Sequence, residues 1–234
     1  MRIIAGRFRR RKLLANPGLT TRPISDFVKE SLFTRLGDWI AGQRVADVFS
    51  GTGTIGLEAL SRGAASVVFI EKDRKAVELL KHNIASLGEQ AETACLCWQT
   101  DIFRCSFRPK GDSAKFVPFD WIFFDPPFVM VEELSPTSEL FRVLKQLARE
   151  DVSSPDTRLV LRTPERAQFV MPDAWELAHH WPFSHMEIFI YRKANLPEPE
   201  TLDEPPATCS PGPCGLSDLP HQEESTDPQV DGIQ

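Results

Sequence analysis

The sequence lacks several features that would assign the chain to a common class of protein. No uninterrupted apolar run approaches the roughly 20 residues of a membrane-spanning helix, and the most apolar stretch, Trp121–Val131, is broken by an aspartate and two prolines. The basic N-terminus has no apolar segment of the kind found in secretory signals. The five cysteines are an odd number without the paired spacing of a zinc site. We therefore expect a protein of the reducing cytoplasm, with no membrane span and no metal site.

Charge of one sign is absent from each end of the chain. No acidic residue precedes Asp26, and no lysine or arginine follows Lys193. The whole chain has 27 basic and 33 acidic residues, a net charge of −6, which by itself argues against a nucleic-acid partner. Nine of the acidic residues follow Lys193, so residues 1–193 hold 24 acidic residues and have a net charge of +3. The net charge of the chain is therefore the sum of two different segments.

Composition divides the chain into three parts. Residues 1–20 begin with alternating apolar and basic side chains around Gly6, which predicts a basic β-hairpin. Residues 21–193 are long enough for one domain with a substantial core. Residues 194–234 contain eight of the 19 prolines and almost no large apolar residues, which predicts a disordered acidic tail.

Apolar runs alternate with helical patterns through the middle part. One helix is expected over 26–40, and three more after the first, second and fourth apolar runs. A polar loop is expected over 104–119. The last two runs follow each other closely, which predicts a terminal antiparallel hairpin. The alternation predicts an α/β fold with a mostly parallel, seven-stranded sheet covered on both faces. The expected strands are Val45–Phe49, Val67–Glu71, Thr93–Trp98, Trp121–Phe124, Arg158–Arg162, Trp175–His180 and Met186–Tyr191.

A glycine-rich motif, Gly51-Thr52-Gly53-Thr54-Ile55-Gly56, lies between the first strand and its helix. Glycines allow a ligand to approach the backbone, and Glu71, at the end of the second strand, is placed to accept hydrogen bonds from both ribose hydroxyls. Asp47 is placed either to face a cationic part of the ligand or to brace the loop. This pattern alone fits a nicotinamide cofactor and S-adenosylmethionine equally.

A second motif, Asp125-Pro126-Pro127-Phe128, follows the fourth strand and favours methyl transfer. An exocyclic amine on a base ring is a poor nucleophile, because its lone pair is delocalised. The Asp125 carboxylate and the Pro126 carbonyl can together accept both N–H groups of such an amine, which directs its lone pair at a methyl donor. Phe128 would stack on the base. The two motifs together predict S-adenosylmethionine as the cofactor, and this chemistry needs no metal.

Further motifs accompany these two along the body of the chain: Arg2-Ile3-Ile4-Ala5-Gly6-Arg7, Thr21-Arg22-Pro23, Asp26, Val28-Lys29-Glu30, Asp47–Gly53, Glu58–Gly63 and Glu71-Lys72-Asp73. Together they resemble the RsmD-type 16S ribosomal RNA guanine-N2 methyltransferases, over Arg2 to about Arg192. Phe27 and Lys29 depart from the resemblance, since the family commonly has arginines there.

The resemblance implies a Rossmann-like enzyme that methylates N2 of one guanine in 16S ribosomal RNA, guanine 966 in the family's name. The substrate would be a small ribosomal subunit or its assembly intermediate, and we expect the enzyme to be a monomer. By matching motif, Asp125, Pro126, Pro127 and Phe128 would hold the target base. Cofactor contacts are expected from Asp47, Ser50, Gly51, Thr52, Gly53, Glu71 and Asp101. RNA contacts are expected from Arg7, Arg9, Arg10, Arg11, Lys12 and Arg22.

Other interpretations share parts of this pattern. An amino-methyltransferase acting on DNA or on protein glutamine would use the same pocket. A nicotinamide dehydrogenase has no use for the Asp125–Phe128 motif. A non-catalytic ribosomal RNA-binding assembly factor would keep the fold without the reaction. The basic cluster of residues 7–12 is either an RNA contact or a solvated face, and its density in acid-free sequence favours RNA.

Overall fold

The computed structural model describes residues 1–15 and 24–194. These residues belong to one compact unit. The Thr21–Pro23 motif with its expected RNA contact Arg22, and the expected tail after Ala194, lie outside the described residues. None of the described helices is both long and apolar enough to span a membrane.

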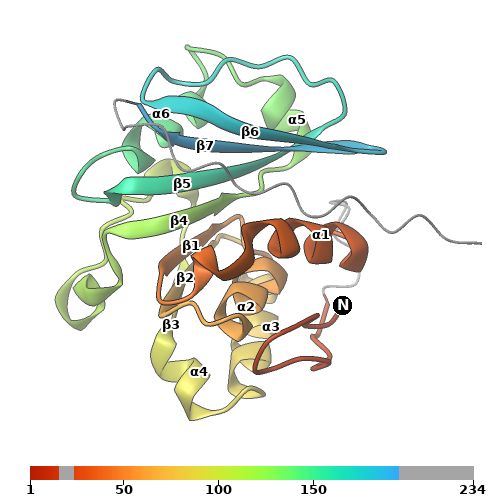
Figure 1. Cartoon of the computed structure of the whole chain (residues 1–234). Helices are drawn as coiled ribbons and strands as arrows, with labels where there is room; N and C mark the ends of the chain where they lie inside the picture. The colour runs from red at the N-terminus through yellow and green to blue at the C-terminus, as the bar shows by residue number, and fades with distance from the viewer. Residues whose placement is uncertain (16–23, 195–234) are drawn as a thin grey trace, which may run out of the picture. The chain divides into compact units, whose positions relative to one another are not determined.

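A seven-stranded sheet organises the fold (Figure 1), in the strand order β3-β2-β1-β4-β5-β7-β6. Neighbouring strands from β3 to β5 pair in parallel, while β7 pairs antiparallel with both β5 and β6. The predicted mostly parallel sheet with a terminal antiparallel hairpin is thereby confirmed. The strands are β1 Arg44–Val48, β2 Ser66–Glu71, β3 Cys95–Gln99, β4 Phe119–Phe124, β5 Ser153–Pro164, β6 Trp175–Phe183 and β7 Met186–Lys193.

Helices cover both faces of the sheet. Alternate strand residues point to opposite faces, so Phe123 packs in a cluster with helices α1, α2 and α3, and Phe124 packs in a second cluster with α6. The α-helices are α1 Asp26–Leu36, α2 Thr54–Ser61, α3 Arg74–Ala85, α4 Glu89–Ala94, α5 Phe128–Glu132 and α6 Glu139–Leu147. Short 3₁₀ helices are η1 Gly37–Ile40, η2 Ile102–Arg104 and η3 Gly111–Phe116.

Local sequence signals explain where several helices begin. The side chains of Ser25, Asp73 and Ser138 each accept a hydrogen bond from the backbone N–H three residues later, at 2.7–3.3 Å. Such bonds satisfy one of the backbone donors that the first turn of a helix leaves without a partner. The helices α1, α3 and α6 therefore begin at residues with capping side chains.

Three local expectations were wrong. Thr93 and Ala94 end helix α4 rather than begin a strand, because Glu89–Ala94 consists mainly of helix-favouring residues. The expected polar loop over 104–119 contains buried Phe107 and Phe116 and the 3₁₀ helix η3, so apolar contacts anchor it to the core. The first helix ends at Leu36, where a glycine with positive φ follows, and η1 continues the chain to Ile40.

The N-terminal hairpin is present in a reduced form. One antiparallel bridge pairs Arg2 with Lys12, and three backbone hydrogen bonds of 2.9–3.0 Å connect residues 1–3 with residues 10–13. Ile3 and Leu13 are buried in the cluster that contains α1 and α2. The segment is therefore part of the folded body and not a separate arm.

Candidate active site

A cavity of about 860 Å³ lies at the carboxyl ends of β1, β2 and β4. The chain enters β2 and β4 on opposite sides of β1, so this is the edge where strand order reverses and where α/β sheets bind ligands. Nearly all of the predicted cofactor and base contacts line the cavity. They are Asp47, Ser50, Gly51, Thr52, Glu71, Asp101, Asp125, Pro126, Pro127 and Phe128.

Gly53 does not line this cavity and has a structural role. It precedes α2 in the left-handed conformation, at φ 84°. A Cβ atom at this position would lie 2.4 Å from Leu80 Cδ1. A side chain is therefore disfavoured by the backbone conformation, and it would also require Leu80 of α3 to shift.

The Glu71 carboxylate holds the glycine loop in place. It accepts hydrogen bonds from the backbone N–H groups of Gly51 at 2.8 Å, Lys72 at 2.9 Å and Asp73 at 2.8 Å. A carboxylate has about four lone-pair sites, so acceptor capacity remains for a ligand hydroxyl. Glu71 is thus positioned both to fix the loop and to contact a bound ligand.

Asp47 braces the junction between the loop and α2. Its Oδ2 atom accepts a hydrogen bond from Gly56 N–H at 2.8 Å, and the residue is 1% exposed. Burial raises the pKa of Asp47 to about 8, and the nearby Asp125 and Glu71 charges act in the same direction. Two roles were considered for Asp47. The hydrogen bond from Gly56 shows that it braces the loop, and its side chain also lines the cavity, where a ligand could contact it.

Two polar side chains of the cavity wall have capacity for a ligand. The buried Ser50 Oγ has no hydrogen-bond partner within the described part of the chain. The Asp101 carboxylate accepts one hydrogen bond from the described residues, from Phe103 N–H at 3.0 Å. Buried polar atoms normally have partners, so the Ser50 hydroxyl in a cavity wall is suited to bind a ligand. Ile70, Ile102 and Phe103 make the adjoining wall apolar.

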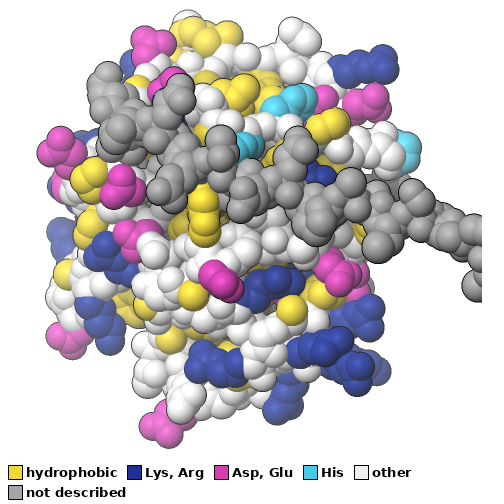
Figure 2. Space-filling view, in the orientation of Figure 1, with side chains coloured by type: hydrophobic (Ala, Val, Ile, Leu, Met, Phe, Trp, Pro, Cys, Tyr) yellow, Lys and Arg dark blue, Asp and Glu magenta, His cyan; other side chains and the backbone are white. Residues whose placement is uncertain are grey.

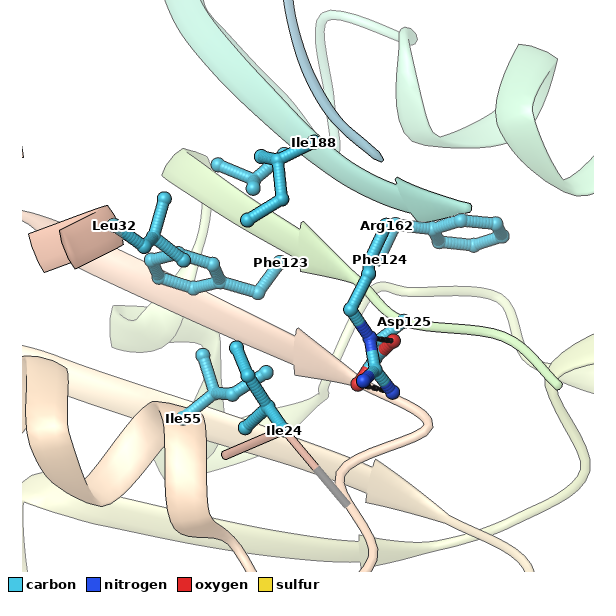
Figure 3. A pocket seen from close by; sticks show the side chains of 9 residues that line it. Ile24, Leu32, Ile55, Phe123, Phe124, Asp125, Arg162 and Ile188 are labelled. Carbon is cyan, nitrogen blue, oxygen red and sulfur yellow. Dashed lines mark hydrogen bonds and ion pairs between the residues drawn. The ribbon is translucent and has the colours of Figure 1, made fainter. Parts of the chain in front are cut away.

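Asp125 forms a buried, two-bond ion pair with Arg162 of β5 (Figure 3). Arg162 Nε donates to Asp125 Oδ1 at 2.6 Å, and Nη2 donates to Oδ2 at 3.0 Å. The two side chains are only 9% and 15% exposed. Burial raises the pKa of Asp125 above its usual range, while the Arg162 charge and hydrogen bonds oppose that rise. The guanidinium carbon of Arg162 also lies 5.3 Å from the centre of the Phe128 ring.

Arg162 was not predicted from the sequence. The register of β4 and β5 aligns Phe124 with Leu161, which brings the next residues, Asp125 and Arg162, side by side. A signal was present, since Arg162 is the charged residue that directly follows the apolar run 159–161. At the carboxyl end of a buried parallel strand, such a residue faces the ligand edge.

A second charged group that was not predicted from the sequence anchors the N-terminal segment. Fully buried Glu58 of α2 accepts hydrogen bonds from the backbone N–H groups of Ile4 at 2.7 Å and Ala5 at 3.1 Å, and from Arg62 Nε at 2.9 Å. Lys29 Nζ lies 3.7 Å from Glu58 Oε2 and donates to Arg2 O at 2.6 Å. The Arg2–Arg7 motif and the Glu58–Gly63 motif thus meet in one buried network.

Close packing accompanies this network. At Gly6, which has φ 79°, a Cβ atom would lie 1.9 Å from Ser61 O. Asn83 of α3 donates to both Leu14 O, at 3.1 Å, and Thr52 O, at 3.0 Å. The N-terminal segment is therefore connected to the glycine loop through a single amide side chain.

The predicted RNA-contact residues Arg7, Arg9, Arg10, Arg11 and Lys12 are all exposed. Arg7 donates to Gln90 and lies over the Phe8 ring, and the other four side chains form no hydrogen bond or ion pair within the described residues. Lysine and arginine side chains gather on the side of the molecule (Figure 2) where Figure 1 places residues 1–15. The basic cluster predicted from the sequence is therefore exposed on the surface of the folded protein.

Comparisons with known proteins agree on one family. The family described as Conserved hypothetical protein 95 matches residues 1–192. Ribosomal RNA small subunit methyltransferase D of Haemophilus influenzae is 32% identical over 179 residues, which cover 76% of this chain and 86% of that protein. The Escherichia coli protein of the same name is 40% identical over 130 residues, which cover 55% of this chain and 60% of that protein.

Solved structures share the fold. The structure of yhhF from Escherichia coli has a TM-score of 0.66 and 28% identity, and the match covers 82% of this chain and 97% of that chain. An RNA methyltransferase from Salinibacter ruber, in complex with S-adenosyl-L-homocysteine, has a TM-score of 0.52 at 18% identity, covering 78% of this chain and 100% of that chain. The latter similarity concerns the fold alone.

Proposed function

This chain belongs to the family described as Conserved hypothetical protein 95, the RsmD family of small-subunit ribosomal RNA methyltransferases, and we propose that it methylates 16S ribosomal RNA. The proposed reaction transfers a methyl group from S-adenosylmethionine to N2 of one guanine, within a small ribosomal subunit or its assembly intermediate. One observation carries the proposal: the glycine loop and the Asp125–Phe128 motif line the same cavity. A cofactor loop and a base-holding motif then lie within reach of each other.

The residues of the cavity fit S-adenosylmethionine, which supplies an electrophilic methyl group when bound. Glu71 retains acceptor capacity for a ribose hydroxyl, and Ser50 Oγ offers a buried polar group without a partner among the described residues. Asp47 would lie on the methionine side, where a cationic amine lowers the pKa of a buried carboxyl. Asp101 would contact the adenine, beside the apolar wall of Ile102 and Phe103.

The Asp125–Phe128 motif would prepare the guanine for methyl transfer. The amine at N2 is a weak nucleophile because the ring delocalises its lone pair. The Asp125 carboxylate and the Pro126 carbonyl accept its N–H groups, which localises the lone pair on nitrogen and orients it. Stacking on the Phe128 ring stabilises a guanine that has left its own stack, at about 1–3 kcal/mol per base.

The exposed basic cluster of residues 7–12 would bind the RNA backbone. Contacts to phosphates position an RNA without specifying its sequence. The selection of one guanine then depends on the fit of the base in the cavity and on the shape of the surrounding RNA.

The substrate is tested by mass spectrometry of 16S ribosomal RNA from cells that lack this protein. We expect one guanine to lose a methyl group on N2 and to regain it when the gene is restored. Methylation assays on deproteinised DNA, on protein substrates and on unmethylated small subunits separate this function from the alternatives. Label only on DNA or protein contradicts the proposal.

The role of Asp125 is tested by the substitution Asp125→Ala. We expect the methylation rate to fall by at least about 100-fold, with RNA binding nearly unchanged, because the acceptor for the amine is removed. Asp120→Ala is the matched control, since Asp120 lies on the same strand and also pairs with an arginine, at the opposite end of β4. Equal methylation by Asp125→Ala and the wild type would refute this mechanism.

A further inference from the structure

The Asp125–Arg162 pair is unusual in its surroundings. It borders a small cavity of about 10 Å³ whose other lining residues are all apolar (Figure 3), namely Ile24, Leu32, Ile55, Phe123, Phe124, Val160 and Ile188. An isolated carboxylate in such surroundings takes up a proton, because desolvation disfavours its charged form. The two hydrogen bonds from Arg162 counteract this tendency.

The protonation state of Asp125 matters for the proposed reaction. As a carboxylate it has about four lone-pair sites, and Arg162 occupies one on each oxygen. The remaining sites can accept N–H groups of the guanine. A protonated carboxyl group would instead carry an O–H donor, which competes with the N–H groups of the base.

Arg162 also determines geometry. Its two parallel hydrogen bonds fix the plane of the Asp125 carboxylate, which a single-point donor such as lysine does not do. The same guanidinium lies over the Phe128 ring at 5.3 Å, within the range of a cation–π contact. One side chain thus contacts both groups that are proposed to hold the base.

We propose that Arg162 is a positioning residue for methyl transfer, which holds Asp125 as an oriented carboxylate and fixes the Phe128 ring beside it. This inference rests on the proposed function of the cavity. It assigns the base-holding site to three elements, the β4 end, the start of α5 and the β5 end, rather than to the Asp125–Phe128 motif alone.

The charged groups around Asp125 determine how the rate depends on pH. Arg162 faces it from β5, and Asp47 from β1. The same large cavity is lined by further titratable side chains, which are Glu71, Lys72 and Asp73 at and after the end of β2, Asp101 after β3, and His185 in the turn between β6 and β7. The side chains that α1 and α2 contribute to the adjoining small cavity, Leu32 and Ile55, are apolar. Among the described residues, Arg162 is therefore the cation that directly contacts Asp125.

The test compares Arg162→Gln and Arg162→Lys in the full-length protein. Both kcat and KM for unmethylated small subunits are measured from pH 6 to pH 9, and binding of S-adenosylmethionine is measured by calorimetry. For Arg162→Gln we expect kcat to fall about 100-fold at pH 7 and the acidic limb of its pH profile to move to higher pH, so that the loss shrinks at pH 9. Cofactor affinity should stay within about threefold, since the substitution leaves the glycine loop intact.

Arg162→Lys separates the two roles of the side chain. Its ammonium keeps Asp125 ionised, so the acidic limb should stay near that of the wild type, while kcat on the plateau falls by about 10-fold because the two-bond fork is absent. Arg44→Gln is the control. It removes an equivalent two-bond pair, Arg44–Asp120, at 3.0 and 3.1 Å, from the other end of the sheet, and kcat should stay within about twofold.

Two results would overturn the inference. One is a folded Arg162→Gln protein with the kcat and pH profile of the wild type. The other is an equal loss of kcat in both variants at every pH, which indicates a merely structural role. If Arg162→Gln does not fold, a wild-type kcat for Arg162→Lys would also overturn the inference. A wild-type protein that methylates no small subunit refutes the proposed function itself, and the inference with it.

Discussion

Single buried carboxyl groups set much of the chemistry of the cavity. Asp47 is buried and Asp125 is partly buried at the carboxyl ends of adjacent strands, and desolvation raises the pKa of each. Asp120 lies at the other end of β4. Burial acts to raise its pKa as well, but hydrogen bonds and the charge of Arg44 outweigh that and lower it. The pKa values of Asp125 and Asp120 thus shift in opposite directions, although each carboxylate pairs with an arginine, because burial prevails at Asp125 and the arginine prevails at Asp120.

Asp47 predicts a dependence of stability on pH. Between about pH 4 and pH 8 the folded protein keeps a proton on Asp47 that the unfolded chain has released, so its contribution to the free energy of unfolding decreases as pH rises. Asp47→Asn removes that decrease, and its amide oxygen can still accept from Gly56 N–H. We expect the free energy of unfolding of Asp47→Asn, minus that of the wild type, to be larger at pH 9 than at pH 5 by at least about 1 kcal/mol.

Urea denaturation at the two pH values measures this difference. Asp120→Asn serves as the control, because the lowered pKa of Asp120 places its titration below pH 5, so its difference from the wild type should stay constant between pH 5 and pH 9. A constant difference between Asp47→Asn and the wild type across pH would contradict the prediction.

At the scale of elements, helix α2 connects the glycine loop to the N-terminal segment. It begins next to the glycine loop and carries Glu58, which binds the backbone of residues 4–5. Lys29 of α1 contacts Glu58 and donates to Thr54 Oγ1 at 3.1 Å. The hairpin, α1 and the start of α2 are therefore held by one set of buried polar contacts.

Glu58→Ala should destabilise the protein strongly. It leaves the buried Lys29 ammonium without its counter-charge and two backbone N–H groups without their acceptor, at a cost of about 3 kcal/mol or more in the free energy of unfolding. Glu78→Ala is matched to it, since Glu78 also pairs with an arginine four residues away, but in an exposed pair whose loss costs less than about 1 kcal/mol. Equal changes in urea midpoint for the two variants would show that the buried network contributes little.

At the scale of the whole molecule, positive charge and the cavity are arranged on one folded body. The overall charge of −6 gives no indication of this, because the basic residues 7–12 are exposed together on the N-terminal segment. Met1 and Ala15 of the same segment line the cavity. An RNA bound along the basic cluster would thus reach the site by a short path.

Replacing Arg9, Arg10 and Arg11 together with glutamine should weaken RNA binding, because fewer cationic side chains then neutralise phosphates. The slope of log affinity against log salt should become shallower by about 0.7 for each phosphate of a single-stranded RNA that is no longer neutralised, up to about 2. Filter binding of deproteinised 16S ribosomal RNA over a salt series measures both the affinity and the slope.

A control with the same change in charge replaces Arg74, Arg142 and Lys145 with glutamine. These residues lie on α3 and α6, and two of them form exposed ion pairs within their own helices. If this variant changes the slope as much as the first, the cluster binds only through net charge and not as a located surface.

Much of the fold follows from local signals. Ser25, Asp73 and Ser138 mark helix starts, and the seven apolar runs mark the strands. The errors arise where tertiary contacts decide, as with buried Phe107 and Phe116 in a segment that is polar on average. A local pattern does not reveal which of its apolar residues will find a place in the core.

By itself, the sequence determined the order of the strands, four of the six described α-helices, and the motifs that follow β1 and β4, because each depends on residues close together along the chain. Only the tertiary structure decided the partners of the buried charges. Asp125 meets Arg162 through the register of two strands, and Glu58 meets the backbone of residues 4–5 across more than 50 residues. Such pairs form because a charge removed from water must find its counterpart wherever packing places one, and packing depends on the whole chain.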